Sequence, residues 1–293
     1  MPTDARTEYN GTSYADREVT KAPEWHGLVA WDMLFNGLTT GLFLTAALGE
    51  LAAPEVFTRV AKAAYPLALV LLIADLLCLV LDLGDPLRFH HMLRVFKPTS
   101  PMSLGTWCLT VYSFPLTVAA ALSLLPAEWS SFEWVRKAAV VLAILPALGS
   151  ALYKGVLLST TAQPGWRDAR WLGCYQTNSA LLLGCAEMLA LSVLLRQESA
   201  TPILRLALAL LLVLNVVPLS LLVANLRPAL VRIYTPRQLA RLAALCIGGG
   251  ILVPLGLLLA GLSPLLLLLA VLLLLLGSLA LRFLIVRLPH ASV

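Results

Sequence analysis

Residues 265–277 read LLLLLAVLLLLLG, and this stretch decides the fold class. In a strand of a membrane-spanning β-barrel, apolar and polar residues alternate, and this run does not alternate. An α-helix bonds all its backbone polar groups within its own segment, as a hydrocarbon environment demands. The stretch therefore predicts a transmembrane helix.

The composition extends this prediction to the whole chain. Of the 293 residues, 59% are hydrophobic and only 13% are charged, and the mean hydropathy is +0.86. Soluble domains carry roughly 25% charged residues, so most of this chain's surface must face something other than water. A soluble enzyme is excluded, and we expect a lipid bilayer and no nucleic acid around the protein.

Apolar stretches long enough to cross a hydrocarbon core of about 30 Å recur along the chain. We therefore predict an all-α membrane protein with about eight transmembrane helices, at residues 28–53, 63–83, 103–125, 136–160, 171–195, 201–225, 239–261 and 263–286. Residues 1–27 are polar, lack the pattern of a signal peptide and are expected to form a solvated arm. Eight spans place both termini on one membrane face, called the terminal side below.

Basic residues are distributed unequally between the two faces. With this topology, 14 Lys and Arg residues fall on the terminal side and 6 on the opposite side. The positive-inside rule then places both termini in the cytoplasm. Basic loops also suit the docking of a partner protein, so the count favours this orientation without deciding it.

Ionisable residues inside predicted spans mark a functional site by default, because a charge in hydrocarbon is costly. Asp32 lies early in the first span, where a carboxylate must be paired, hydrated or protonated, which suits proton exchange. Asp75 lies in the middle of the second span and could relay protons or pair with Lys154 of the fourth. Glu187 in the fifth span could lie on a proton path or make a structural hydrogen bond. Glu50 is expected at the membrane interface.

Asn36 and Gly37 belong to a small, polar face of the first span. Such a face suits close helix packing, which is common in membranes, and it also suits the lining of a cavity. Both interpretations stay open from the residues alone.

Histidines and cysteines argue against redox metals in this chain. A transmembrane haem needs axial ligands that face each other within the spans, but all four histidines fall in or beside terminal-side loops. The five cysteines are scattered, with no CxxC spacing for a cluster or zinc site. We expect no haem, no iron–sulfur cluster and no other metal, so any electrons must come from another chain.

Two terminal-side loops contain more basic, aromatic and proline residues than a simple connection between spans requires. Residues 84–107 read GDPLRFHHMLRVFKPTSPMSLGTW, and residues 159–171 read STTAQPGWRDARW. Such dense loops are typical of ordered segments that a partner or cofactor contacts. The basic and imidazole side chains of the first loop are the expected docking residues, namely Arg88, His90, His91, Arg94 and Lys97.

The chain resembles the NrfD family, typified by the membrane subunit of polysulfide reductase. The resemblance rests on EWHGLVAWDMLFNGLTTG at residues 24–41, DLGDPLRFHHMLRVFKPTSPMSLGTW at 82–107, YKGVLLSTTAQPGW at 153–166, and eight spans. It implies two four-helix bundles, residues 28–160 with a quinone site and residues 161–293 as a second bundle. It also implies a four-cluster ferredoxin-like iron–sulfur subunit and a molybdopterin catalytic subunit as partners.

The resemblance carries over to single residues. Tyr153 matches the family's tyrosine that contacts the quinone headgroup, and Asp32 falls where the family often has a polar His, Asn or Tyr. Asp32 and Tyr153 are therefore the expected catalytic residues, with Asn36, Gly37 and Trp166 beside them in binding menaquinone or ubiquinone. Asp75, Lys154 and Glu187 are the expected proton path.

The resemblance also implies the inner membrane of a bacterial or archaeal cell. It leaves the substrate of the catalytic partner open. Two other functions compete: a proton or ion carrier, supported by the charges at depth, and a passive membrane anchor. A carrier would take up protons without an electron donor, whereas an anchor would bind no quinone and would tolerate replacement of Asp32.

Overall fold

A computed structural model of the chain describes residues 25, 27–126 and 131–291. The expected arm at residues 1–27 lies almost wholly outside the described residues, as does His26. All regular elements in the described part are helical: α1 (Gly27–Ala52), α2 (Pro54–Leu81), η1 (Pro86–Leu93), α3 (Pro101–Ser123), α4 (Glu133–Ser159), α5 (Leu172–Leu194), α6 (Ala200–Leu214), α7 (Val216–Ile233), α8 (Pro236–Ala243), η3 (Ala244–Leu252), α9 (Val253–Ala260) and α10 (Pro264–Ala291). Eight helical spans among them are long and apolar enough to cross a membrane. The predicted all-α membrane fold is confirmed.

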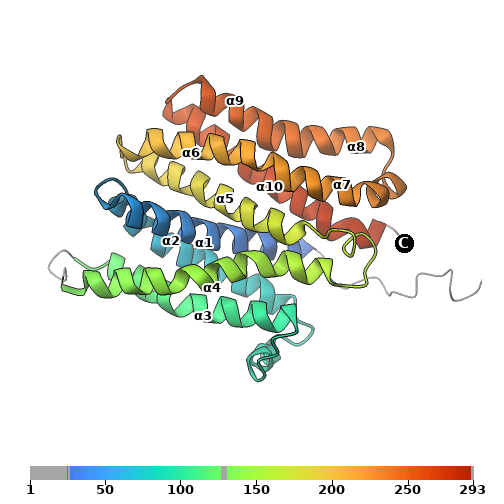
Figure 1. Cartoon of the computed structure of the whole chain (residues 1–293), viewed down its shortest axis with the longest axis horizontal. Helices are drawn as coiled ribbons and strands as arrows, with labels where there is room; N and C mark the ends of the chain where they lie inside the picture. The colour runs from blue at the N-terminus through green and yellow to red at the C-terminus, as the bar shows by residue number, and fades with distance from the viewer. Residues whose placement is uncertain (1–24, 26, 127–130, 292–293) are drawn as a thin grey trace, which may run out of the picture.

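The spans run side by side in an elongated slab (Figure 1). α3 and α4 lie at one edge, α8 and α9 at the other, and α1 and α5 pass between them. α1 begins where α10 ends: a Cβ atom on Gly27 would lie 3.5 Å from the ring of Phe283. The first and last spans therefore reach the same side, as the even number of spans predicts.

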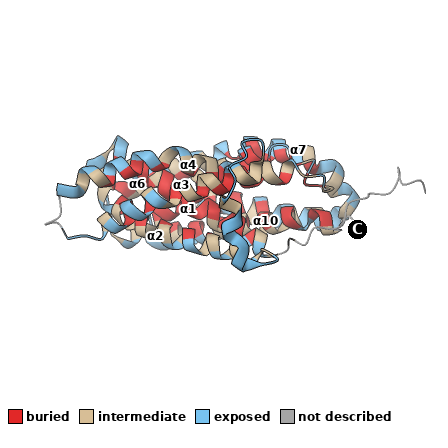
Figure 2. Ribbon diagram, turned by 90° about the horizontal axis from the view of Figure 1, so that it is seen from below, coloured by how far each residue is buried: buried red, intermediate tan, exposed pale blue. Residues whose placement is uncertain are grey.

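α1 is the central helix and the most buried span, packing against α2, α4, α5 and α10. Its contact with α5 is backbone against backbone, because a Cβ atom on Gly41 would lie 1.8 Å from the carbonyl oxygen of Ala180. Gly184 faces Gly41 in the same way at 1.9 Å. Small residues allow this close approach where no hydrophobic effect drives helices together. Buried residues consequently gather along the middle of the slab, and exposed residues lie on its outer faces (Figure 2). Many of the exposed residues are large and apolar.

Two predicted spans have different limits in the structure. Residues 54–62, expected as a loop, are already helical, because Pro54 begins α2 one residue after α1 ends. The sixth span does not end at residue 225 but continues through α7 to Ile233. It is interrupted at Asn215, three residues before Pro218, whose missing N–H cannot continue the helical hydrogen bonds.

The seventh span contains the irregular segment η3, nine residues in π-helical conformation. Its Gly250 lies against α10: a Cβ atom there would lie 2.8 Å from the Cα of Gly277. The wider π turn changes which side chains share a face, and such segments are frequent at functional sites.

The division into two bundles stays a prediction. α1, α2, α3 and α4 do pack on one another, but α5 packs on both α1 and α4 as well as on α6 and α10. α5 therefore joins the two halves.

Candidate functional site

A single buried lysine lies between two buried aspartates in the first half of the chain. Lys154 Nζ on α4 is 2.6 Å from Asp75 Oδ1 on α2 and 2.8 Å from Asp32 Oδ1 on α1. Its hydrogen bonds go to Asp75 and to the main-chain oxygen of Asp32, the latter at 3.0 Å. Asp32 Oδ1 therefore has the charge contact with Lys154 without a well-aligned hydrogen bond, and this oxygen is itself buried.

Asn36 completes this cluster from the next turn of α1. Its amide nitrogen donates to Asp75 Oδ2 at 3.2 Å and to Ser150 Oγ on α4 at 2.9 Å. Asp75 is thereby held by a lysine and an amide, with no exposed side-chain surface. The predicted pairing of Asp75 with Lys154 is confirmed, and Asp32 shares the same lysine.

Tyr153 lies next to the cluster and is positioned by a glycine. A Cβ atom on Gly105 of α3 would lie 1.9 Å from the ring of Tyr153, so only glycine leaves room for that ring. Lys154 Nζ lies 5.7 Å from the ring centroid, within reach of a cation–π contact. The structure thus brings together five predicted residues, namely Asp32, Asn36, Asp75, Tyr153 and Lys154.

The charges of this cluster do not balance. Two carboxylates share one ammonium group, giving a net charge of −1 that a single proton would neutralise, and uncompensated buried charge is costly. The three side chains differ in exposure: those of Asp32 and Lys154 are 8% and 7% exposed, and that of Asp75 is fully enclosed. One negative charge of the cluster is therefore left without a cation, and of the two carboxylates only Asp32 has a side chain that is not fully enclosed.

Other predicted site residues lie apart from the cluster. Gly37 faces α10 and α5, since a Cβ atom there would lie 2.9 Å from the Arg282 guanidinium. Trp166 is fully buried, stacks on Trp25 and donates its indole N–H to the Ile285 carbonyl oxygen at 2.8 Å. These contacts fasten the loop after α4 to the end of α10, and they occupy the only donor of the Trp166 side chain.

Glu187 is buried in α5, and its Oε2 has no hydrogen-bond partner among the described residues. Within the part of the chain that the structure describes, no hydrogen bond links Glu187 to the cluster around Lys154. Its assignment to a proton path stays a prediction.

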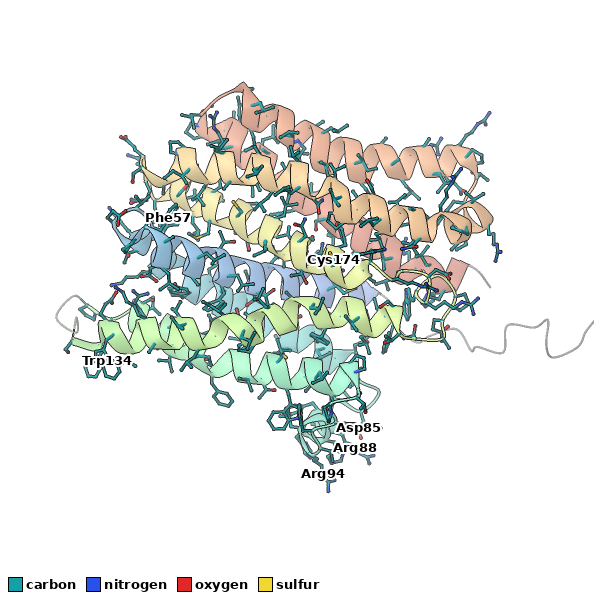
Figure 3. All side chains as sticks on the ribbon, viewed as in Figure 1. Phe57, Asp85, Arg88, Arg94, Trp134 and Cys174 are labelled. Atoms are coloured by element: carbon teal, nitrogen blue, oxygen red, sulfur yellow. The ribbon has the colours of Figure 1, made fainter. Side chains whose placement is uncertain are left out.

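The five expected docking residues project from one surface. η1 and the residues after it stand out from the slab beside α3, and Arg88 and Arg94 point away from the body of the protein (Figure 3). All five are exposed, in company with exposed apolar side chains that include Leu87, Val95 and Phe96. The surface is both basic and apolar, a mixture suited to a protein partner.

Glu50 and Arg136 form an ion pair at the other end of the first half, which the sequence did not suggest. Glu50 is not at a wet interface: it is 2% exposed and accepts two hydrogen bonds from Arg136, at 2.5 and 2.9 Å. Tyr65 also donates to Glu50, at 2.7 Å, and Glu133 binds the same guanidinium. Residues at span ends look interfacial in sequence, and only the packing of α1, α2 and α4 covers them.

Arg282 is a second residue whose role the sequence did not reveal, because it looked like a basic residue near the end of the last span. Its side chain is fully buried and has no carboxylate partner among the described residues. It donates to the Met33 carbonyl oxygen at 3.1 Å, to Gln176 at 3.2 Å and to Ser179 at 3.3 Å, and it also bonds Ser278. Arg282 thus links α10 and α5 to α1 one residue after Asp32.

The fold and this site define a multi-pass membrane protein with a buried Asp32–Lys154–Asp75 charge cluster near the start of its central helix. Among the described residues, no group of three or more His, Cys, Asp or Glu side chains could hold a metal ion. The family model described as polysulfide reductase, NrfD_2, matches residues 12–293. The chain therefore belongs to this family of membrane subunits. No curated protein matches the chain.

Proposed function

We propose that the chain is the quinone/quinol-binding subunit of a multi-subunit oxidoreductase. In this proposal it exchanges electrons with a four-cluster ferredoxin-like iron–sulfur subunit, which is attached to a molybdopterin catalytic subunit. The observation that carries the proposal is the Asp32–Lys154–Asp75 cluster beside Tyr153, on the terminal side of a chain of this family.

The chemistry of the cluster suits this role. A quinone accepts two electrons and two protons, so its carbonyl oxygens need nearby hydrogen-bond donors and a group that exchanges protons. The Tyr153 hydroxyl and the Lys154 ammonium can donate, and the Asp32 carboxyl group, which shares Lys154 with Asp75, can hold or release a proton. Asp75 accepts a hydrogen bond from Lys154, and Asn36 in turn donates to Asp75, so both residues hold the lysine in place.

The basic and apolar surface around η1 is the proposed docking site of the iron–sulfur subunit. Residues 84–100 leave α2 and enter α3, the helix whose Gly105 contacts Tyr153. A partner docked there would place its nearest cluster on the side from which Asp32 is reached. Short electron transfer and proton access would then coincide.

Two substitutions in the intact complex test the proposal. Asp32→Asn keeps the size of the side chain but removes its proton exchange, and we expect quinol turnover to fall about 100-fold or more. Tyr153→Phe removes one hydroxyl, and we expect a loss of about tenfold. Glu55→Gln at the opposite end of the fold and Tyr234→Phe are matched controls. Wild-type turnover in both site variants would rule the assignment out.

A proton carrier is the second candidate function, because Glu187 is a buried carboxyl group with an unpartnered oxygen. It lies in α5, the helix that joins the two halves. Liposomes that hold the chain alone, with no electron donor, separate the two functions: steady proton uptake that Glu187→Gln abolishes would favour the carrier. A passive anchor would show neither proton uptake nor any effect of Asp32→Asn.

The orientation of the subunit belongs to the proposal as well. The excess of Lys and Arg on the terminal side favours cytoplasmic termini in the inner membrane of a bacterial or archaeal cell. Cys174, exposed at the start of α5 on the terminal side, offers a test. In right-side-out vesicles, a membrane-impermeant maleimide should leave Cys174 unmodified until the membrane is opened.

A further inference from the structure

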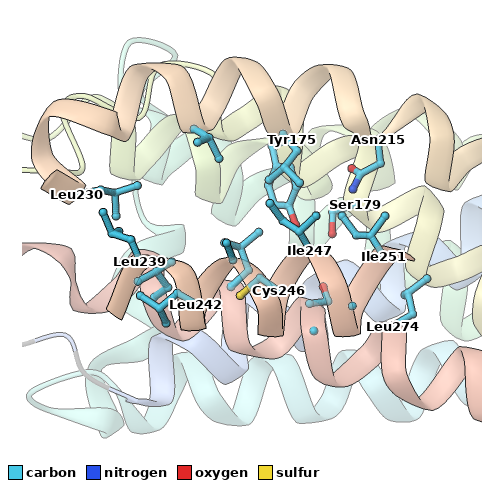
Figure 4. A pocket seen from close by; sticks show the side chains of 18 of the residues that line it. Tyr175, Ser179, Asn215, Leu230, Leu239, Leu242, Cys246, Ile247, Ile251 and Leu274 are labelled. Atoms are coloured by element: carbon cyan, nitrogen blue, oxygen red, sulfur yellow. The ribbon is translucent and has the colours of Figure 1, made fainter. Parts of the chain in front are cut away.

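A cavity of about 340 Å³ lies in the second half of the chain, apart from the cluster around Lys154. It is lined by α5, α7, α8, η3 and α10 and is partly open to the surroundings, and Figure 4 shows it from close by. Most of its wall is Leu, Ile and Val. The volume is within the range of small-molecule sites.

Polar side chains gather along one part of this wall. Tyr175 and Ser179 come from α5, and Asn215 stands at the break between α6 and α7 (Figure 4). Ser278 comes from α10. Tyr175, Ser179 and Asn215 are each less than 5% exposed. These polar groups would not stabilise a cavity that holds only hydrocarbon chains, because burying polar groups without hydrogen-bond partners costs free energy.

Arg282 sets the hydrogen-bonding direction of the two serines. Its guanidinium donates to both Ser179 Oγ and Ser278 Oγ, so each hydroxyl accepts a bond and keeps its own proton available. Other helical hydroxyls, such as those of Ser113 and Ser123, donate to carbonyl oxygens three or four residues earlier. In the described structure Ser179 and Ser278 make no such bond to a carbonyl oxygen. The Ser179 hydroxyl pairs with that of Tyr175, so this pair keeps one proton to donate into the cavity, and Ser278 keeps its own.

Asn215 adds a third donor at the same depth. Its side-chain oxygen accepts a bond of 2.7 Å from Asn178, which leaves the amide N–H₂ for another acceptor. The only charged residue of the cavity wall is Arg227 of α7, toward the terminal side. The inner wall thus offers donors to a neutral acceptor, and no carboxylate lines the cavity in the described part of the chain.

The break at Asn215 and the π-helical segment shape this site. The interruption of the sixth span turns the Asn215 side chain toward α5, and the wide turn of η3 directs Cys246, Gly250 and Ile251 to the cavity. Contact between Gly250 and Gly277 closes the side formed by η3 and α10. Two irregularities that each weaken a membrane helix therefore meet at one cavity.

We propose that this cavity binds a second isoprenoid quinone, ring inward and tail toward the lipid. A carbonyl-bearing neutral ring matches the donors of the Ser179–Tyr175 pair, Ser278 and Asn215, and an isoprenoid tail matches the apolar wall. A phospholipid chain would place its terminal methyl against these donors, which is why the structure disfavours it. The inference rests on the proposed quinone chemistry for its choice of ligand, but it concerns a site that Asp32 and Tyr153 do not touch.

Cys246 provides the test, because its thiol lies in the cavity wall (Figure 4). The full chain is reconstituted in dioleoyl phosphatidylcholine liposomes, and its modification by N-ethylmaleimide is followed by peptide mass spectrometry. Decylubiquinone should slow modification of Cys246 several-fold and leave that of the exposed Cys174 unchanged. Decylbenzene, which has the alkyl chain without carbonyl groups, is the matched control ligand.

The possible outcomes separate the occupants. No protection by decylubiquinone overturns the site, and equal protection by decylbenzene overturns the ring-inward orientation. Cys246→Trp, which fills the cavity, should lower the quinone that co-purifies with the chain by one equivalent. Loss of a phospholipid in its place would identify a lipid site and overturn the proposal.

The measurement also separates this site from the proposed function. Thiol protection in Asp32→Asn protein should equal that of the wild type, because the two sites are distinct. If Asp32→Asn and Tyr153→Phe both leave quinol turnover unchanged, the first site fails while protection of Cys246 can still succeed. Ser278→Ala tests the ring contact in a protein whose cavity is not filled, and we expect it to weaken decylubiquinone protection and spare that by decylbenzene.

Discussion

Gly105 of α3 lies against the ring of Tyr153 of α4 so closely that a Cβ atom on Gly105 would approach a ring carbon to 1.9 Å. The ring therefore occupies space that any other residue at position 105 would take. Gly105 fixes the place of the tyrosine hydroxyl without touching the cluster around Lys154 itself.

Gly105→Ala should consequently displace Tyr153 and lower quinol turnover of the intact complex about as much as Tyr153→Phe does, roughly tenfold. The control is Gly256→Ala in α9, where an added Cβ atom meets nothing within 4 Å. Both glycines are helical, so the gain in helix propensity is equal. If the two variants behave alike, Tyr153 does not depend on Gly105 for its position.

Substitutions of different residues in the charge cluster should affect the stability of the chain unequally. Lys154→Met leaves two carboxylates buried without a cation, and breaking a buried pair in this way costs about 3–5 kcal/mol. Asp75→Asn leaves one carboxylate with one lysine, and the new amide can still accept from Lys154. We expect the thermal unfolding temperature of the purified chain in detergent to fall steeply in the first variant and little in the second.

A double variant supplies the counter-test. In Asp75→Asn/Lys154→Met protein, only Asp32 remains charged, so the loss should be smaller than with Lys154→Met alone. A double variant as unstable as Lys154→Met would mean that the lysine acts through packing and not through charge.

The Glu50–Arg136 pair should be structural. Arg136→Met removes the one cation among the described residues that contacts Glu50, and it should destabilise the chain by about 3–5 kcal/mol. Glu133→Gln alters the same guanidinium contact, but the Glu133 side chain is 32% exposed, so its effect should be a small fraction of that. Unfolding in detergent gives both values, and equal losses would contradict the assignment.

Assembly with the iron–sulfur partner should depend on the surface around η1. Charge reversal by Arg94→Glu with Lys97→Glu should reduce co-purification of the partner about tenfold or more while the chain stays folded, because like-charge contacts at an interface cost several kcal/mol. Arg59→Glu with Lys137→Glu, exposed at the opposite end of the spans, is the matched control. Equal recovery of the partner in both double variants would exclude this surface as its docking site.

Hydropathy predicted the number of spans because a bilayer imposes the same length on every segment that crosses it. It failed at residues 54–62 and beyond residue 225, because helices continue past the hydrocarbon wherever no residue stops them. The break at Asn215 depended on Pro218, a signal that was present in the sequence but was hidden inside an apolar run.

The sequence by itself determined that Asp32, Asp75 and Lys154 are unusual, since charge within an apolar span is costly in any arrangement. It could not determine that one lysine serves both aspartates, because which faces of α1, α2 and α4 meet depends on contacts between helices. The same holds for Glu50 with Arg136 and for Arg282 beside the cavity. Gly41 and Gly184 show why. These glycines allow the backbones of α1 and α5 to come into contact, and only the packed structure shows which two helices meet there.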